Sequence, residues 1–458
     1  MGVKELYPYL CLTPFIHYPN INNVSDSIDE SERATILKSL EDVPVQPRKA
    51  QVYVHVPFCT THCTFCFYNI RLAKEDNPIF SRYVDALIAE IELYASTAYA
   101  QHLEFEHVFV GGGTPSVLPA PLMDRLFGAI RRSFFANREP KEFSVEFALQ
   151  TMTEDRVQAC RDNGITRISF GWQTFSPMAR KRMSLIPSEE TLRQSMKLLR
   201  TYEYSVNTDL IFGLPEQTSA DWDDDLKKAL DFGFDGIDVF PIQPVPPSPL
   251  YSLIRQNKIL IASSDELLGM LRSAVGTFSG AGYVRSNFQR FYKPEVPTSE
   301  NRYNNALFST AHDTISVGSG SIGMVADWAY MNGRNIDAYI EWKDTWASPA
   351  SCATKMDDDK WVERAFCLQL PWTWRLRKET LRAKPTKTQR ATIDALKSHG
   401  LLEETSEEYR LLTEAEGYNF NIARSFVSEE NQVRNLEYAQ SLSNEINWKP
   451  NTQTSVAV

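Results

Sequence analysis

Short β-rich apolar runs alternate with longer segments of helical periodicity from residue 52 onward, and this alternation constrains the fold more than any other feature of the sequence. Such alternation is typical of parallel α/β folds. Segments 78–96 and 188–202 carry apolar residues at i, i+3 and i+4, the spacing that buries one face of a helix. The runs predicted to be strands are VYVHVPF (52–58), EHVFVGG (106–112), EFSVEFAL (142–149), RISFGWQT (167–174), VNTDLIFG (206–213) and GIDVFPI (236–242).

These six βα units predict an α/β fold, built as an open, partial (β/α)6 barrel. Barrels of this kind carry their chemistry at the carboxyl ends of the strands. Glycines and polar residues stand at or just after those ends in this chain. Strand-end Gly and Pro also form simple turns, which explains one run well but six runs less well. We therefore expect the functional site at this end of the barrel.

The chain divides into five segments by pattern. They are an N-terminal arm (1–48), the partial barrel (49–300), a connecting region that completes the active-site pocket (301–370), a C-terminal winged-helix-like α+β unit (371–446) and a disordered tail (447–458). The C-terminal unit is predicted because a helix that ends at Gly400 is followed by two strands and another helix. We interpret this unit as a lid over the substrate.

The charge balance restricts the partners of the chain. Its formal net charge is −10, which gives no general attraction to nucleic acid or to an anionic membrane. The N-terminal sequence lacks the apolar core of a signal peptide, and no long apolar span follows. No heptad repeat stands out. We expect a cytoplasmic monomer that binds a small molecule, with no nucleic acid and no membrane partner.

Three of the seven cysteines cluster in one short segment after the first predicted strand, Cys59-Thr-Thr-His-Cys63-Thr-Phe-Cys66. An odd number of cysteines with one cluster does not indicate a disulfide framework. Thiolates suit iron–sulfur clusters, and an iron without a protein ligand can bind a cofactor. A zinc site with His62 as fourth ligand and a set of buried structural cysteines are the alternatives. We favour iron–sulfur because no second Cys/His cluster completes a structural zinc site.

The segment YVHVPFCTTHCTFCFYN resembles the signature of radical S-adenosylmethionine (SAM) enzymes, specifically the family of oxygen-independent coproporphyrinogen oxidase. The CxxxCxxC spacing after a first strand is highly specific to this superfamily. The resemblance covers roughly residues 50–330. It continues through GGGTPS (111–116), SVEFA (144–148), RISFGWQTF (167–175), NTDLIFGLPEQT (207–218) and GSGSIG (318–323).

The resemblance implies that Cys59, Cys63 and Cys66 hold a [4Fe–4S] cluster whose fourth iron binds SAM. Its reduction cleaves SAM to methionine and a 5′-deoxyadenosyl radical. Tyr53 matches a family tyrosine that lies against SAM, and Phe65 is the aromatic residue before the last cysteine. Each could equally be a core aromatic.

Further cofactor-binding residues are implied by the later motifs. Backbone at Gly111, Gly112 and Gly113 can approach the methionine amino group, and Thr114 can cap the segment after it. Glu146 is a carboxylate inside an apolar run, where a SAM amino or ribose group is a suitable partner. Gln173 and Asp209 match family residues that contact SAM, although a polar network between strands is the alternative. The second glycine turn, with Ser319, Ser321 and Ile322, matches the part that lines the substrate or second-SAM pocket.

Two positions depart from the family pattern. The family has an arginine twelve residues after the glutamine, where this chain has Leu185, and Arg182 is the candidate substitute for holding the SAM carboxylate. Coproporphyrinogen oxidase has a further cysteine two residues after the cluster triad, where this chain has Tyr68. This second departure disfavours porphyrinogen decarboxylation.

We therefore predict transfer of a methyl or methylene carbon from a second SAM to an sp2 carbon of a planar or unsaturated substrate, as in the methyltransferases and cyclopropanases of this family. Anaerobic haem ring opening and coproporphyrinogen III decarboxylation are alternative reactions. A haem chaperone is the non-enzymatic alternative, with His55, His62 and His312 as possible haem ligands. The radical mechanism also implies an electron donor such as flavodoxin or ferredoxin.

The segment RSNFQRFYK (285–293) mixes three cations with three aromatic residues. This composition suits stacking on a flat anionic substrate. A solvated strand face is an equally good interpretation.

Overall fold

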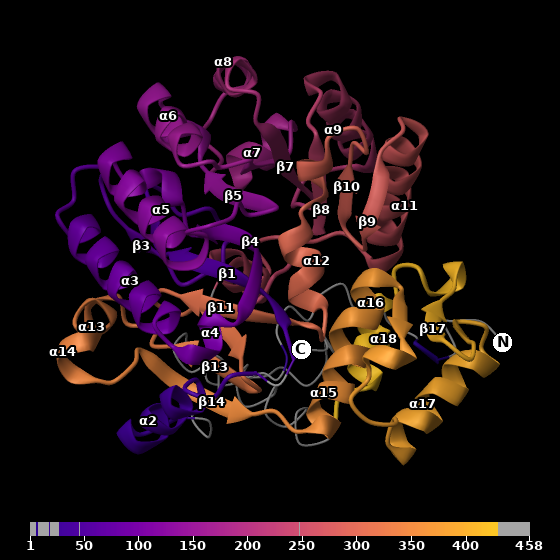
Figure 1. The fold of residues 1–458 in the computed structure, drawn as a ribbon. Coiled ribbons are helices and arrows are strands. Elements are labelled where there is room, and N and C mark those ends of the chain that lie inside the picture. The colour runs from indigo at the N-terminus through magenta and orange to yellow at the C-terminus, as the bar shows by residue number, and fades with distance from the viewer. Residues whose placement is uncertain (1–5, 8–17, 19–26, 45, 247, 429–458) are drawn as a thin grey trace.

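A computed structural model describes residues 6–7, 18, 27–44, 46–246 and 248–428 (Figure 1). The predicted disordered tail (447–458) and much of the predicted N-terminal arm lie outside the described residues. One twelve-stranded sheet forms the centre of the molecule, in the order β14-β13-β12-β11-β1-β4-β5-β6-β7-β8-β10-β9. Helices cover the outer side of this sheet, and a small C-terminal group of helices and strands lies beside it (Figure 1).

All six predicted strands are present and lie side by side in the predicted order, each parallel to the next. The prediction of an open parallel α/β barrel is therefore confirmed. The strands are β1 (Arg48–Val56), β4 (Leu103–Gly112), β5 (Glu142–Phe147), β6 (Arg167–Gln173), β7 (Ser205–Phe212) and β8 (Gly236–Pro241). The main helices between and after them are α3 (Ile79–Ala95), α5 (Ala120–Phe134), α6 (Glu154–Asp162), α8 (Glu189–Thr201), α9 (Ser219–Phe232) and α11 (Ser264–Gly280).

The six parallel strands have one apolar and one polar face, because successive side chains of a strand point to opposite sides. On β1, Val52, Val54 and Val56 are fully buried toward the helices. The other face carries Tyr53 and His55, and through the parallel register it continues into polar residues of β5, β6, β7 and β8. A parallel strand buried on both sides is normally apolar throughout. The polar face is therefore unusual for such a sheet, and the barrel interior that it lines is called the chamber below.

Both edges of the barrel sheet extend beyond the six units. β11 (His312–Val317) pairs parallel with β1, and β12 (Ile322–Val325), β13 (Trp328–Asn332) and β14 (Ala350–Lys355) continue it as an antiparallel meander. At the other edge, β10 (Arg290–Tyr292) pairs with β8, and β9 (Val284–Asn287) with β10. Much of the predicted connecting region (301–370) thus belongs to the main sheet.

Shorter elements complete the barrel. Near its ends and edges lie β2 (Phe58–Cys59), β3 (Arg71–Leu72), α4 (Ala98–Gln101), α7 (Pro177–Arg182), α10 (Pro249–Arg255), α12 (Arg302–Phe308), α13 (Ile336–Ile340) and α14 (Trp342–Thr345). The helix α2 (Glu30–Ser39) begins at the N-cap Asp29, whose side chain and that of Glu32 form a capping box. No helix among the described residues is long and apolar enough to cross a membrane.

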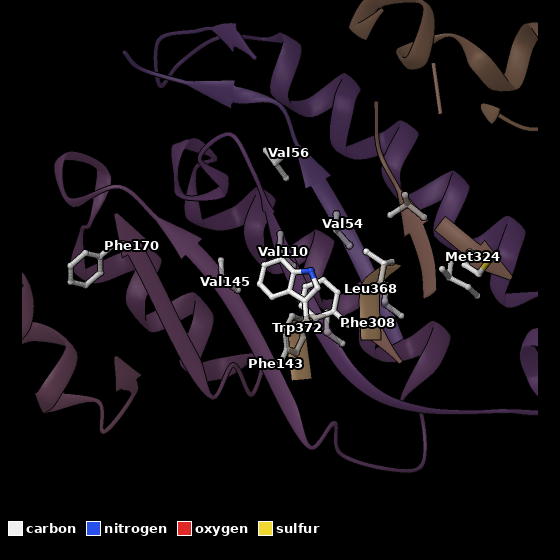
Figure 2. Packing of buried hydrophobic residues seen from close by; sticks show 14 of the residues in the cluster. Val54, Val56, Val110, Phe143, Val145, Phe170, Phe308, Met324, Leu368 and Trp372 are labelled. Carbon is white, nitrogen blue, oxygen red and sulfur yellow. The ribbon is translucent and has the colours of Figure 1, made fainter. Parts of the chain in front are cut away.

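The C-terminal group packs on the barrel through aromatic rings. It contains α15 (Asp358–Arg364), α16 (Leu370–Thr373), β15 (Arg375–Arg377), α17 (Lys387–Ser398), β16 (Leu402–Glu404), β17 (Glu408–Leu411) and α18 (Asn419–Ser425). Its three strands form a separate sheet, β15-β17-β16. Trp372 stacks on Phe308 of α12 with ring centroids 4.2 Å apart, and this pair is visible among the buried residues in Figure 2. These rings therefore join the C-terminal group to the barrel core.

Candidate functional site

The cysteine loop begins directly after β1 and is held at both ends. The ring of Phe58 is fully buried and packs edge-on against Phe80 and Tyr83 of α3, with centroids 5.0 and 5.1 Å away. The backbone N–H of Ala73 donates to the carbonyl of Cys59 at 3.0 Å, so the loop closes on itself through β2 and β3. The thiols therefore lie at the carboxyl end of the first strand, as predicted for barrel chemistry.

All three thiols of the loop are partly buried and are not in disulfides. Burial raises the pKa of Cys59, Cys63 and Cys66 to about 11 each, and the thiols also raise one another's pKa, so they lie close together. The Sγ of Cys59 is 3.4 Å from the Oγ1 of Thr114. A soft metal centre displaces such protons and binds the thiolates. The donor set therefore fits an iron–sulfur cluster with three protein ligands.

The geometry gives little support to a zinc site with His62 as the fourth ligand. His62 is exposed, and its Nε2 lies 3.3 Å from the backbone carbonyl oxygen of Cys66. Within the described ranges, no three His, Cys, Asp or Glu side chains are gathered tightly enough around one point to hold a single metal ion. A multi-iron cluster has sulfur ligands spread more widely than those of one ion.

The glycine run joins the second strand to the cysteine loop. The N–H of Gly113 donates to Val56 O at 2.8 Å, and the N–H of Thr114 donates to Phe58 O at 2.7 Å. A Cβ on Gly113 would stand 2.7 Å from Phe58 O, and one on Gly112, where φ is +109°, would stand 2.6 Å from the ring of His55. Glycine is therefore required for this close approach of two strand ends.

Glu146 lies beside the glycine run and faces the barrel interior. Its Oε2 accepts a hydrogen bond from the N–H of Gly112 at 3.1 Å. Burial raises the pKa of Glu146 to about 7, and the hydrogen bond from Gly112 only partly opposes this effect. The side chain is nevertheless only partly covered, so a ligand entering the interior can reach it.

Negatively charged side chains outnumber positively charged ones inside the barrel. The strand residues that face the interior include four carboxylates and the single cation Arg167, and β10 adds Arg290, which pairs with Asp238 at 3.2 Å. The four carboxylates are Glu142, Glu146, Asp209 and Asp238. Burial and the neighbouring carboxylates raise the pKa of Asp209 well above its ordinary value. The excess of negative groups fits a cationic ligand, and SAM carries both a sulfonium and an amino group.

Asp209 and Gln173 line the same chamber. The amide of Asn207 donates to Asp209 Oδ1 at 3.4 Å and to Asp238 Oδ2 at 3.2 Å, so the predicted polar network between strands is also present. Gln173 has a φ of 75° at an irregularity between β6 and β7, and its Oε1 is buried without a hydrogen-bond partner. An orphaned buried acceptor is costly unless a ligand supplies a donor.

The two aromatic residues predicted at the site, Tyr53 and Phe65, lie in different surroundings. Tyr53 contacts the rings of Phe109 and of Tyr303 on α12, at centroid distances of 6.3 and 6.2 Å, and these two rings also contact each other at 5.1 Å. The hydroxyl of Tyr53 lies 2.9 Å from His55 Nδ1. Phe65 instead packs against a second apolar cluster that includes Met183 and Leu250. The structure thus places Tyr53 inside the barrel and Phe65 between the loop and the neighbouring segments.

Tyr68 stands at the mouth of the barrel. Its side chain is 50% exposed, and it stacks on Phe67 at 4.9 Å. Burial of the hydroxyl raises the pKa of Tyr68, and the nearby charges of Glu146, Cys66 and Asp209 raise it further. The residue that departs from the family pattern thus lies close to the site.

The second glycine turn is held by a buried carboxylate on α3. Glu90 accepts hydrogen bonds from Gly318 N at 2.9 Å, from Asn332 Nδ2 at 2.7 Å and from the hydroxyl of Tyr339. The same Asn332 amide donates to Ser321 Oγ at 3.2 Å, and Ile322 begins β12. The turn is therefore fixed beside the end of β1, because a Cβ on Gly318 would stand 2.4 Å from His55 O.

Arg182 lies away from the chamber. Its guanidinium is 43% exposed, and Nε lies 3.5 Å from Glu216 Oε1. Leu185 packs against the same apolar cluster as Phe65. Arg182 thus pairs with Glu216 rather than with Glu146 or Asp209, although the neighbouring Met183 contacts the cysteine loop at Thr64.

The aromatic and cationic segment 285–293 is built into the fold, and both of its predicted interpretations are wrong. Arg285 pairs with Glu416 of the C-terminal group and stacks on Trp374 at 4.6 Å, while Arg290 pairs with Asp238. Phe288 and Phe291 are at most 1% exposed. The segment connects the sheet to the C-terminal group because its rings and charges are satisfied internally.

Sequence reasoning missed several residues in or around the interior. Arg167, Tyr303 and Glu90 were not singled out, and Arg290 was noted only as one of the cations of segment 285–293. Arg167 begins the predicted strand RISFGWQT, where a charged residue is the same kind of signal that identified Glu146. The three histidines proposed as haem ligands do not converge. His55 lies near the end of β1, His62 is exposed, and His312 pairs with Lys49 at the start of β1. A surface hollow of about 350 Å³ near Phe105 contains none of the predicted site residues.

Comparisons with known proteins agree with this geometry. The sequence profile of the radical SAM superfamily matches residues 53–229. Anaerobilin synthase of Escherichia coli O157:H7 is 32% identical over 297 residues, which cover 64% of this chain and 65% of that protein, slightly less than two thirds of its length. Oxygen-independent coproporphyrinogen III oxidase of Bradyrhizobium diazoefficiens is 28% identical over 342 residues, covering 72% of this chain and 74% of that protein.

The fold has a solved counterpart. The structure of coproporphyrinogen III oxidase from Escherichia coli superimposes with a TM-score of 0.75 at 21% identity, over 93% of this chain and 98% of that one. Radical SAM enzymes use SAM together with a [4Fe–4S] cluster, and the three-cysteine loop and the carboxylate-rich chamber suit both cofactors. The chain is therefore similar over part of its length to proteins of the radical SAM superfamily, and among these to the oxygen-independent coproporphyrinogen III oxidases and to anaerobilin synthase.

Proposed function

We propose that this enzyme transfers a methyl or methylene carbon from a second SAM molecule to an sp2 carbon of a planar, unsaturated substrate. The observation that carries the proposal is the polar interior of the barrel, where Glu146, Asp209 and Gln173 are only partly buried and the Oε1 of Gln173 has no hydrogen-bond partner. Cys59, Cys63 and Cys66 would hold the [4Fe–4S] cluster. When bound, this cluster supplies the electron that splits SAM into methionine and a 5′-deoxyadenosyl radical.

The residues of the chain bind and orient the first SAM. The carboxylates of Glu146 and Asp209 attract its cationic groups, and partial burial of both side chains strengthens this attraction. The unpaired Oε1 of Gln173 accepts a hydrogen bond that the protein does not supply. The glycine run lets the backbone approach the ligand because no side chain intervenes.

The second SAM and the substrate require space next to the first. Ser321 and Ile322, on the turn held by Glu90, are the residues we assign to that side. Tyr68 at the barrel mouth and Tyr53 in the interior limit access of water to the reacting carbon. Exclusion of water and a fixed geometry matter here because a carbon radical attacks whatever lies nearest. The C-terminal group is our candidate for the lid.

Anaerobic opening of a haem ring is a second candidate reaction. It is favoured by the 32% identity to anaerobilin synthase and by Tyr68, which stands where coproporphyrinogen oxidases have a further cysteine. Both reactions begin with the same cleavage of SAM and differ in the acceptor and in the fate of the product radical.

The test is anaerobic reconstitution with iron and sulfide, followed by incubation with SAM, dithionite and haem. We expect 5′-deoxyadenosine together with S-adenosylhomocysteine, and a modified tetrapyrrole if haem is the acceptor. 5′-Deoxyadenosine without S-adenosylhomocysteine would indicate hydrogen abstraction or decarboxylation and contradict carbon transfer. Stoichiometric haem binding without SAM turnover would support the chaperone alternative.

Cysteine variants test the cluster assignment. Cys63→Ala should abolish the absorption near ~400 nm of the reconstituted protein. Cys160→Ala is the matched control, because Cys160 is fully buried in α6. Loss of the absorption in the control, or its retention in Cys63→Ala, contradicts the assignment.

A further inference from the structure

The two segments that flank the cysteine loop differ from the rest of the chain in charge. Residues 177–188 and 240–262 contain no Asp or Glu, although the whole chain has 58 acidic residues and a net charge of −10. The cysteine-loop segment 57–73 also contains none. Exposed cations in the two flanking segments are Lys181, Arg182, Arg255 and Lys258. A positively charged surface therefore lies beside the loop of an otherwise acidic protein.

Both segments contact the cysteine loop directly through Thr64, which is adjacent to Cys63. The N–H of Thr64 donates to Met183 O at 3.1 Å, and its Oγ1 lies 3.2 Å from Ser184 Oγ. The N–H of Leu250, at the start of α10, donates to Thr64 O at 2.8 Å. The positively charged surface is thus attached to the loop that carries the thiols.

The same two segments expose apolar side chains. Of the eight large hydrophobic residues that are exposed in the described part of the chain, four lie here: Met178, Ile186, Leu260 and Ile261. Leu260 is 86% exposed and Ile186 is 65% exposed. Apolar residues surrounded by charged ones are typical of a protein–protein interface.

Two of the cations are available to a partner. Arg182 is partly neutralised by Glu216 at 3.5 Å. In contrast, no ion pair among the described residues involves Lys181 or Lys258. Lysines of this kind raise the rate and specificity of association with an acidic partner more than they stabilise the fold.

We propose that Met178, Lys181, Ile186, Lys258 and Leu260 form the docking surface for a small acidic electron-transfer protein. The inference rests on the cluster assignment of the proposed function. One electron leaves the reduced partner and reduces the cluster, and it then enters SAM as the carbon–sulfur bond breaks. The surface suits this role because both of its segments contact the cysteine loop at Thr64, while SAM would bind in the barrel interior. Its positive charge is complementary to the partner's negative charge.

The experiment measures binding of purified oxidised flavodoxin to the full-length reconstituted protein by fluorescence anisotropy. The double variant Lys181→Glu/Lys258→Glu should raise the Kd by about 10-fold or more at low salt, and added salt should weaken binding to the unmodified protein. Lys227→Glu/Lys343→Glu carries the same charge change on exposed positions of α9 and α14 and should leave the Kd within about 2-fold. Basic cytochrome c should not bind.

A second variant and a second readout keep the test decisive. Ile186→Ser/Leu260→Ser removes apolar contacts without a change in charge and should also weaken binding. Equal weakening by the test and control variants, or salt-independent binding, overturns the proposal. So does a change in oligomeric state in the charge variant, because the surface would then join two copies of this chain.

Cleavage of SAM with dithionite separates this proposal from the proposed function. Dithionite is a small reductant that needs no docking surface, so all of these variants should cleave SAM with it at the unmodified rate. Failure of cleavage in the unmodified protein would contradict the proposed function. The flavodoxin affinities would still decide the docking surface on their own.

Discussion

At the scale of one residue, the environment of the Glu146 carboxyl group explains its expected affinity for a cation. Burial disfavours the charge of its carboxyl group, and the hydrogen bond from Gly112 and the nearby cations Arg167 and Arg290 only partly offset this, so the ligand-free protein stabilises the charge poorly. A buried carboxylate whose charge is poorly stabilised lowers the stability of the fold but increases the affinity for a positively charged ligand. Burial and the neighbouring carboxylates likewise disfavour the charge of Asp209.

Glu146→Gln should weaken SAM binding by at least about 10-fold, or about 1.4 kcal/mol, without lowering the melting temperature. The amide keeps the size of the side chain and removes a charge that burial disfavours. Isothermal titration of SAM and thermal unfolding of the reconstituted protein measure the two effects. Glu154→Gln, on the exposed start of α6, is the control and should change neither. A large loss of stability in Glu146→Gln would contradict this account.

The affinity for SAM should also depend on pH. Burial raises the pKa of Glu146 to about 7, so the cation-binding ionised form predominates above this pH and is lost as the pH falls through it. We therefore expect the Kd for SAM to rise as the pH decreases below 7. Titrations on both sides of this pH measure the slope. Glu146→Gln should remove it, and an unchanged slope in that variant would rule out Glu146 as the titrating group.

At the scale of elements, the polar face of the barrel depends on hydrogen bonds that cross between distant segments. Glu90 on α3 links that helix to the turn before β12 and to α13. Burial raises the pKa of Glu90 to about 7, and three hydrogen-bond donors stabilise its charge. One carboxylate thus fixes the position of the turn that carries Ser321 and Ile322.

Glu90→Gln should lower the free energy of unfolding by about 1 to 3 kcal/mol, because the amide NH2 would face a donor on Asn332 or Tyr339. Urea denaturation measures this loss. Hydrogen exchange at Gly318 and Ser319 should quicken in the variant. Glu92→Gln, two positions along α3 and exposed, should have no effect on either measurement. Unchanged exchange at the turn would contradict the role given to Glu90.

At the scale of the whole molecule, the C-terminal group contacts the sheet through a largely buried ion pair and through stacked aromatic rings. Arg285 of β9 pairs with Glu416, and its guanidinium lies near the rings of Trp374, Phe291 and Phe288. Phe308 and Trp372 stack nearby at 4.2 Å. The barrel and the C-terminal group therefore share a core, which suits a lid with restricted movement.

Glu416→Ala should destabilise the protein by about 3 kcal/mol, because it leaves a buried guanidinium without its partner. The double variant Arg285→Leu/Glu416→Leu should be less destabilised, since both charges are removed together. Chemical denaturation of Arg285→Leu, Glu416→Leu and the double variant forms a double-mutant cycle. Additive effects would show that the pair does not couple the C-terminal group to the sheet. Glu414→Ala, exposed two residues earlier, is the control.

The sequence by itself determined the six parallel strands and the cysteine loop. Local periodicity reports which face of a strand is buried, and the boundaries of β5, β6 and β8 agree with the predicted runs to within two residues. The thiols were predictable because their spacing lies within one loop. Glu146 was predictable because a carboxylate inside an apolar strand is costly without a role.

Only the tertiary structure decided how distant segments meet. The pairing of β11 with β1 joins Tyr53 to Ser316, and local periodicity carries no information on such a long-range contact. The convergence of Arg290 with Asp238 and the contact of residues 177–188 with Thr64 are of the same kind. The cations and rings of segment 285–293 were misread for this reason, because their partners lie in the C-terminal group. The sequence specifies the chemical groups of each residue, but the packing of the whole chain determines which groups they contact.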